Sequence, residues 1–422
     1  MPARKRKAGA ILPFFDYWWF KTTPAGKAMA VCLIVSGFTA MLSLEIPVYE
    51  LLVALSVFVL VVYAASWLAR PKLEARWRLP EKAVAGQPLE IACGVTNRSW
   101  FWAREIGVGA YGLAPSLKNL GPSGAASAVA PGKTGEISFS LLPLKRGIYA
   151  WPRLNVFTLF PFGLFRTRVR SVYGSNGSGR GGLVVYPNFR PLTSINVPIS
   201  ARYQPGGIAL SSSVGESPEY IGNREYRPGD STRHLDHRSW ARLATPAVRE
   251  YQEEYYCRVG LLLDTFVSDK RRPGPEGYPQ LEGAVSLTAA VAHALALGEY
   301  IIDIFAAGPE LYVFRAGRSH AHFENILEIL ACVGACRSNP FRKITPAVTD
   351  ELGSISSLIC VFLDWDKERE AIVRAAAEAG CSVKVVIVRD GEPTLPCRSD
   401  EMSGTTARYA PQAILAGGVD SL

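Results

Sequence analysis

The chain has 422 residues, of which 48% are hydrophobic, and carries a formal net charge of +9. This length is enough for a membrane anchor and two further domains. Eight cysteines in so long a chain exclude a disulfide scaffold, and a reducing compartment fits them. The high apolar fraction directs attention first to segments that could span a membrane.

Two apolar segments near the N-terminus predict membrane-spanning helices. Residues 28–44 contain no charged side chain, and residues 47–69 contain only Glu50. Each is close to the roughly 20 apolar residues that a helix needs to cross a bilayer. Because the joint between them is only a tight turn, residues 28–69 should form an antiparallel hairpin. A cleaved signal peptide is the alternative for the first segment, but the second would still remain as an anchor.

Basic residues predict which side of the membrane the two ends of this hairpin face. They flank both spans and are missing from the turn, so the positive-inside rule places both termini in the cytoplasm at the inner (plasma) membrane. Residues 1–27 are then a basic and aromatic cytoplasmic segment. Since anionic headgroups account for these charges, the expected partner is the lipid bilayer and no nucleic acid. The flanking basic residues are Arg4, Lys5, Arg6, Lys7, Lys21, Lys27, Arg70, Lys72, Arg76 and Arg78.

Residues 71–190 have the pattern of a β-sandwich. Residues 73–79 and 135–142 alternate apolar and polar side chains, which is the period of a half-buried strand. Residues 89–97 and 147–160 are further candidate strands, and Gly, Pro and Asn occupy the gaps between them. Several short strands with frequent turns favour two packed antiparallel sheets.

The remaining chain divides into a linker, an α/β domain and a tail. Residues 191–256 are polar and irregular, and residues 391–422 are expected to be a C-terminal tail. In residues 257–390, apolar strands alternate with helices, which predicts a mostly parallel sheet covered on both faces. Ligands of such folds bind at the carboxyl ends of the strands, where Asp264 and Asp364 fall. The expected strands are 259–265, 300–307, 311–314, 357–364 and 382–388, and the expected helices are 280–300, 323–333 and 367–379.

Three sets of residues carry a family resemblance. Phe160–Phe165 reads FPFGLF, Arg146 and Gly147 form an Arg-Gly turn, and the linker carries a signature. With these residues the chain resembles the bacterial "domain of unknown function 58" family (DUF58), although His237 stands where the family usually has Trp. The resemblance implies a von Willebrand factor A-like (Rossmann-like) α/β domain after the sandwich. The signature residues are Arg224, Tyr226, Gly229, Asp230, Arg233, Ala241, Arg242, Arg249 and Glu250.

The linker's alternating Arg and acidic residues leave two interpretations open. The first is an ion-paired structural segment, in which each exposed pair contributes little to stability. The second is a docking surface for a partner or a neighbouring domain. The resemblance implies that the partner is a MoxR-type AAA+ ATPase.

A degenerate metal site also follows from the resemblance. Von Willebrand A domains often hold a divalent cation through an Asp-x-Ser-x-Ser segment and a later Asp, and Mg²⁺ prefers such oxygen ligands. Here the segment begins at Asp264 and ends at Ser268, with Phe266 in the first serine position. The later Asp is Asp364 or Asp366. Without a metal, Asp264 would cap the loop that follows it.

The expected function is therefore a non-enzymatic inner-membrane scaffold or adaptor that acts with the ATPase in membrane or envelope processes. No catalytic residue is expected, and no cofactor beyond a possible Mg²⁺. The alternative is a metal-dependent hydrolase of envelope precursors, using Asp264 with Asp364 or Asp366.

Overall fold

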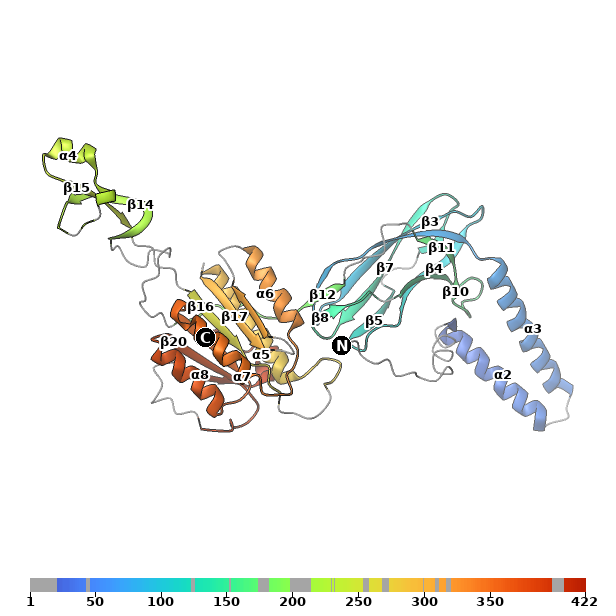
Figure 1. Ribbon diagram of the computed structural model, residues 1–422. Helices are drawn as coiled ribbons and strands as arrows, with labels where there is room; N and C mark the ends of the chain where they lie inside the picture. Colours follow the sequence, from blue (N-terminus) through green and yellow to red (C-terminus); the bar gives the residue numbers. More distant parts are fainter. Residues whose placement is uncertain are drawn as a thin grey trace. The chain divides into compact units, whose positions relative to one another are not determined.

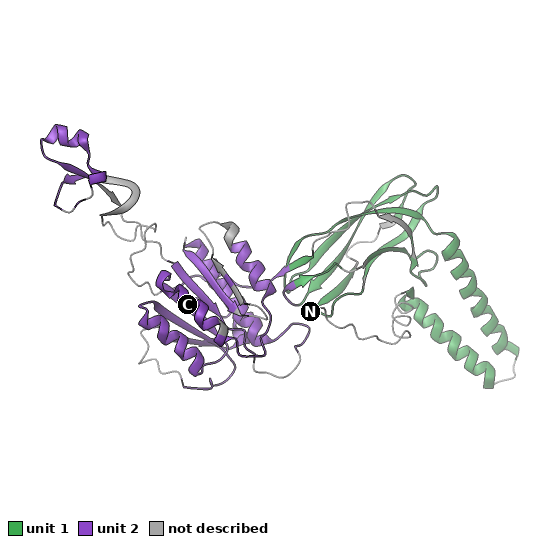
Figure 2. Ribbon diagram, viewed as in Figure 1, with its two compact units in different colours: residues 1–144, 148–184 green, residues 145–147, 185–422 purple. Residues whose placement is uncertain are grey.

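The chain forms two compact units, one of residues 1–144 and 148–184 and the other of residues 145–147 and 185–422 (Figure 2). Each unit is described by itself. The computed structural model describes residues 21–42, 46–122, 126–151, 153–173, 182–197, 214–228, 230, 232–252, 258–267, 273–298, 300–307, 311–315, 320–396 and 406–422.

The first unit begins with the two predicted apolar helices, α2 (Pro24–Leu42) and α3 (Ile46–Leu68), which lie side by side (Figure 1). Both are long and apolar enough to cross a membrane, and little of either is buried within the protein. A third helix of the described chain, α5 (Pro279–Leu297), also meets this length and composition, but 67% of its most apolar window is buried. Apolar side chains that the protein leaves uncovered on α2 and α3 indicate membrane association.

The rest of the first unit is two packed sheets, as a sandwich requires. One sheet has the order β11-β1-β3-β7-β5 and the other β10-β9-β4-β6. Side chains such as Leu73, Ile91, Val108, Ile137 and Phe139 fill the space between the sheets. The strands are β1 (Lys72–Arg78), β3 (Leu89–Asn97), β4 (Ala103–Tyr111), β5 (Leu117–Pro122), β6 (Ala126–Val129), β7 (Thr134–Pro143), β9 (Arg153–Thr158), β10 (Thr167–Arg168) and β11 (Arg170–Tyr173).

The alternating pattern located β1 and β7 correctly, because their inward side chains are apolar and most outward ones are polar. The further candidate strand at residues 89–97 is β3. The pattern did not identify β4, whose sequence AREIGVGAY contains two glycines and so hides the alternation. A short third sheet has the order β2-β12-β8, with β2 (Lys82–Val84), β12 (Leu183–Tyr186) and β8 (Gly147–Tyr149).

The linker of residues 191–256 contains regular structure that the sequence reading did not predict. Strands β14 (Val214–Glu225) and β15 (Ala247–Gln252) form an antiparallel hairpin. Between them lie the 3₁₀ turn η1 (Thr232–His234) and the short helix α4 (His237–Leu243). The numerous Arg and acidic side chains had indicated an irregular segment.

The second unit contains a six-stranded sheet with the order β18-β17-β16-β19-β20-β21. All neighbouring pairs are parallel except β17 and β18. The strands are β16 (Arg258–Leu263), β17 (Ile301–Ala307), β18 (Leu311–Arg315), β19 (Ser357–Phe362), β20 (Ser382–Val388) and β21 (Thr406–Tyr409). The helices are α5, α6 (His320–Cys332), α7 (Phe341–Glu351), α8 (Lys367–Glu378) and α9 (Pro411–Leu415), with the 3₁₀ turn η2 (Leu352–Ser354) after α7.

Two features of this unit differ from the expected domain ending at residue 390. Strand β21 pairs with β20 and α9 packs on α5, so part of the predicted tail of residues 391–422 belongs to the α/β fold. Helix α7 was also not predicted, because Pro346 lies within it and its sequence is polar overall.

Candidate functional site

The candidate site lies where the strand order reverses direction. Strands β16 and β19 are neighbours in the sheet, while the chain between them passes through β17 and β18 on the other side of β16. Such a switch point opens a crevice at the carboxyl ends of the two strands. Asp264 directly follows β16, and its N–H donates to the carbonyl of Val361 in β19 (2.9 Å). The predicted position of Asp264 is thus confirmed.

Asp264 is fully buried and both of its carboxylate oxygens accept hydrogen bonds. One oxygen accepts from the backbone N–H of Phe266 (2.9 Å), and the other accepts from the N–H of Leu363 (2.9 Å). The second oxygen also accepts from Nε (2.8 Å) and Nη2 (2.6 Å) of Arg369, whose side chain is 1% exposed. A guanidinium therefore supplies the positive charge beside this carboxylate.

Arg369 also joins Asp264 to Asp366. Its Nη1 pairs with the carboxylate of Asp366, which in addition caps the N-terminus of α8 by accepting from the N–H groups of Glu368 and Arg369. The guanidinium carbon lies 4.6 Å from the ring centroid of Phe341 and 6.0 Å from that of Phe266, within the range of cation–π attraction. Two carboxylates and two rings thus enclose one arginine.

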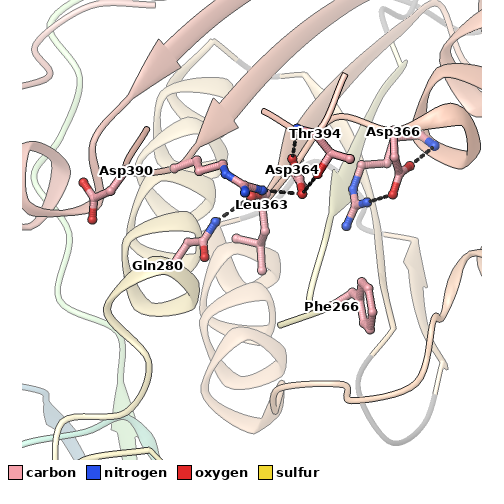
Figure 3. Close-up of a pocket in the computed structure, with 9 residues that line it drawn as sticks. Phe266, Gln280, Leu363, Asp364, Asp366, Asp390 and Thr394 are labelled. Carbon is pink, nitrogen blue, oxygen red and sulfur yellow. Dashed lines mark hydrogen bonds and ion pairs between the residues drawn. The ribbon is translucent and has the colours of Figure 1, made fainter. Parts of the chain in front are cut away.

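Asp364, the other predicted ligand, belongs to a separate group of contacts. It accepts from the hydroxyl (2.6 Å) and the N–H (2.9 Å) of Thr394 and pairs with Arg389 (Figure 3). Nearby, the side-chain amide of Gln280 donates to the carbonyls of Leu363 and Val388, which ties two strand ends together. A cavity of about 440 Å³ is lined by Phe266, Gln280, Leu363, Asp364, Asp366, Arg369, Arg389, Asp390 and Thr394.

These residues do not fit a divalent cation. A cation would need free carboxylate oxygens, whereas both oxygens of Asp264 accept from N–H donors and Arg369 holds the position between Asp264 and Asp366. Ser268, the predicted serine ligand, lies outside the described residues. Within the part of the chain that the structure describes, no three His, Cys, Asp or Glu side chains are grouped to hold a metal.

The pKa values of Asp264 and Asp364 are shifted in opposite directions. Burial raises the pKa of Asp264, and Arg369 and the N–H groups of Leu363 and Phe266 act in the opposite direction. For Asp364, partial burial raises the pKa, but the hydrogen bonds from Thr394 and Trp365 together with Arg389 outweigh it and hold the pKa below its usual value. The pKa of Asp264 is therefore raised overall, whereas that of Asp364 is lowered.

The sequence analysis did not predict that Arg369 is part of the site, although its position on α8 could have indicated it. The buried residues of α8 are Ile372, Val373 and Ala376, at the spacing of one helix face, and Arg369 precedes them by three, four and seven positions. An arginine on the apolar face of a helix must have a buried acidic partner. The missed partners of Asp364, Thr394 and Arg389, come from distant segments and gave no such signal.

The linker holds a second set of predicted residues. Arg224 at the end of β14 binds both carboxylate oxygens of Asp230 (2.7 and 2.8 Å), which also accepts from the N–H of Arg227. Asp236 caps α4 and accepts from Ser239 (2.8 Å), Asn223 (2.6 Å) and Arg249 (3.3 Å). These residues are therefore ion-paired with one another.

These contacts stabilise the charged forms of both acids. Hydrogen bonds, chiefly from Arg224 to Asp230 and from Ser239 and Asn223 to Asp236, lower each pKa from 3.8 to about 2. His237, which stands where the family usually has Trp, stacks on Trp240 with ring centroids 6.2 Å apart.

The other signature residues lie in or beside this hairpin. Tyr226 donates its N–H to the carbonyl of Pro246, and Glu250 pairs in register with Gly222. Arg233, Ala241 and Arg242 are exposed, and Gly229 lies outside the described residues.

The fold and the two sites define a membrane-associated protein in which apolar N-terminal helices precede a strand-rich region and an α/β domain. The model of the family described as "Protein of unknown function DUF58" matches residues 222–396, and this match confirms the resemblance carried by the linker. "Uncharacterized protein YeaD" of Bacillus subtilis (strain 168) is 26% identical over 176 residues. This match covers 41% of the chain and 40% of the relative.

The similarity to solved structures is too low to support a conclusion about the fold. A CARDB domain from Pyrococcus furiosus matches 24% of this chain and 96% of its own, with 16% identity and a TM-score of 0.15. A GH20 exo β-N-acetylglucosaminidase from Vibrio harveyi matches 76% of this chain and 57% of its own, with 8% identity and a TM-score of 0.16.

Proposed function

We propose that the protein is a non-catalytic adaptor, anchored in the inner membrane by a hairpin of α2 and α3 with both termini in the cytoplasm. The observation that carries this proposal is the buried Arg369, which pairs with both Asp264 and Asp366 where a reactive or metal-binding crevice would need open carboxylates. Because the carboxylates of this crevice are paired inside the protein, the crevice favours the role of an adaptor over that of a catalyst.

The α/β domain is proposed to be von Willebrand factor A-like. The strand order supports this assignment. The sheet has the doubly wound order, and its strands are parallel except for the antiparallel edge strand β18. Asp264 at the switch point stands where such domains begin their metal-binding segment. In this chain Arg369 takes the place of the cation.

The proposed docking element is α4. Trp240 and Leu243 on this helix are 39% and 54% exposed, and Arg238 and Arg242 beside them are also exposed. Exposed apolar side chains among arginines suit an acidic protein surface, and Trp and Arg are common anchors of interfaces. The family resemblance suggests that the partner that binds α4 is a MoxR-type AAA+ ATPase, and that the two proteins act together in membrane or envelope processes.

An affinity experiment tests this function. The tagged full chain, solubilised in detergent, should retain a MoxR-type ATPase when nucleotide is present. Trp240→Ala combined with Arg242→Glu should reduce retention at least tenfold, whereas Arg374→Ala, a change in an exposed ion pair of α8, should not. Absence of enrichment over an unrelated membrane protein would remove the proposal.

The metal-dependent hydrolase is the alternative, favoured only by the acidic lining of the cavity, in which Asp364, Asp366 and Asp390 take part. It requires Mg²⁺ or Mn²⁺ binding that disappears in Asp264→Ala. Isothermal titration of the full chain in detergent distinguishes the two functions, since the adaptor predicts no heat of binding that depends on Asp264.

A further inference from the structure

Three loops of the sandwich lie together at the end from which β1 leaves α3: the loop between β3 and β4, the turn before β7 and the turn after β9. Strand β1 starts at Lys72, four residues after α3 ends, and Lys72 bonds to Arg98 and Ser99 in the loop between β3 and β4. The turn before β7 lies against the same loop, because the N–H of Asn97 donates to the carbonyl of Lys133. The turn after β9 lies at this end too, since Leu159 donates to Glu105 at the start of β4.

The turn after β9, Phe160–Phe165, packs directly on the two helices. The hydroxyl of Thr23 donates to the carbonyl of Gly163 (2.6 Å), and the N–H of Thr23 donates to that of Leu164 (3.2 Å). A side chain at Gly26 would begin 2.2 Å from the carbonyl oxygen of Leu164, so α2 and the turn are in backbone contact. The FPFGLF segment therefore joins the sandwich to the start of α2.

The aromatic side chains of this turn extend along α3 toward the middle of the helix. Phe165 packs on Tyr63 and Phe162 on Phe58, each with ring centroids 5.7 Å apart. Phe58 precedes Tyr63 by five residues, which is about 7.5 Å along a helix axis. Phe162 thus lies deeper along the hairpin than the start of α2, and yet it remains 68% exposed.

The polar backbone of the turn is compatible with an apolar surrounding. Besides the two carbonyls bound by Thr23, the N–H of Gly163 donates to Leu159, and that of Phe160 to the hydroxyl of Thr158. Non-helical backbone is tolerated at membrane depth only where protein groups bind it. Here α2 and the sandwich itself provide those groups.

Exposed tryptophans and basic residues surround the turn at the same end of the sandwich. Trp100 is 90% exposed and Trp102 is 56% exposed, both in the loop that Lys72 holds. Lys72, Arg98, Arg104 and Lys133 are exposed around them. Trp favours the headgroup region and Lys and Arg favour anionic lipids, so this composition fits a membrane interface.

We propose that this end of the sandwich is a membrane-contacting surface, with Phe162 inserted beside α3 into the cytoplasmic leaflet and Trp100 and Trp102 in the headgroup region. The partner is a bilayer that contains anionic lipid. Continuity with the hairpin favours lipid over a second protein, because Phe162 packs on a helix that itself spans the bilayer. This inference rests on the proposed membrane hairpin.

Spin labels at single cysteines test the proposal in the full chain. Cysteines other than the buried Cys93, Cys360 and Cys381 are replaced by serine, and the protein is placed in nanodiscs of phosphatidylcholine and phosphatidylglycerol. Labels at Phe162→Cys and Trp100→Cys should collide severalfold more with oxygen, relative to a water-soluble nickel complex, than a label at Ile148→Cys. Ile148 is a matched control, since it is 62% exposed and belongs to the same unit but follows the opposite end of β7.

A label at Leu60→Cys, on the exposed side of α3, separates the two proposals. If it favours oxygen while the labels at 100 and 162 behave like that at 148, the surface does not contact lipid although the hairpin is inserted. If the label at 60 also favours the nickel complex, the membrane hairpin itself is refuted. A label at Trp102→Cys gives the same reading where Phe162→Cys does not fold.

Discussion

The charged cluster of the α/β domain and the end of the sandwich beside α2 and α3 differ in how their buried charges and exposed apolar side chains are accommodated. In the cluster, a fully buried carboxylate is matched by a 1% exposed arginine and by backbone donors, so the protein itself satisfies every charge. At the end of the sandwich, Trp100 and Phe162 remain 90% and 68% exposed. Internal pairing indicates a structural role, whereas exposed apolar side chains beside the apolar helices α2 and α3 indicate an external partner.

The largest expected effect concerns Arg369. Arg369→Ala leaves Asp264 buried without its cation, which should destabilise the α/β domain by about 3–5 kcal/mol. Arg374→Ala on the same helix removes an exposed pair with Glu370 and should cost at most about 0.5 kcal/mol. Thermal unfolding of both variants in detergent provides the measurement, and similar stabilities would mean that the cluster is not held by this ion pair.

The contact between helix and turn is tested by two glycines of α2. Gly26→Ala places a methyl group against the carbonyl of Leu164 and should cost about 1–3 kcal/mol by overpacking. Gly37→Ala meets no atom within 4 Å and should be tolerated. The comparison is read by the melting temperature and by the oxygen accessibility of a label at residue 162. Equal behaviour of the two variants would place the turn away from α2.

A smaller effect is expected for Thr23, which caps α2 by accepting from the N–H of Gly26 (3.0 Å) and also binds the turn. Thr23→Val keeps the shape but loses both bonds, for a cost of about 1–2 kcal/mol. Thr23→Ser, which keeps the hydroxyl, should retain most of the stability. A result in which Ser and Val are equivalent would contradict a hydrogen-bonding role.

The partly buried ion pairs of the linker add a third kind of site to this comparison. The pKa values of Asp230 and Asp236 are lowered to about 2 in the folded chain, so their stabilisation is complete above the usual value of 3.8. It is lost as the pH falls from about 4 toward 2. Hydrogen exchange of residues 214–252, corrected for its intrinsic pH dependence, should accelerate in that interval.

The matched control is the double variant Asp230→Asn and Asp236→Asn. Its hairpin should exchange faster already at pH 7 and should show no further change on acidification. An unaltered pH dependence in this variant would assign the transition to other carboxyl groups.

Much of the architecture was determined by the sequence alone. Apolar runs of membrane length specify α2 and α3, period-two alternation specifies β1 and β7, and the linker signature identifies the DUF58 region, because each depends on residues close together in the chain. The strands and helices around Asp264 were located for the same reason. Glycines hid β4, and β21 and α9 followed a segment that looked like a tail.

Only the tertiary structure decided what the carboxylates do. Asp264 and Arg369 are 105 residues apart, and Thr394 is 30 residues from Asp364. Sequence can show that an arginine lies on the apolar face of α8, but not which acid it meets. The same holds for Phe162 and Phe58, since the contact between a loop of the sandwich and α3 depends on how the chain folds back on itself. Local pattern fixes the elements, whereas charge pairing and exposure depend on which elements meet.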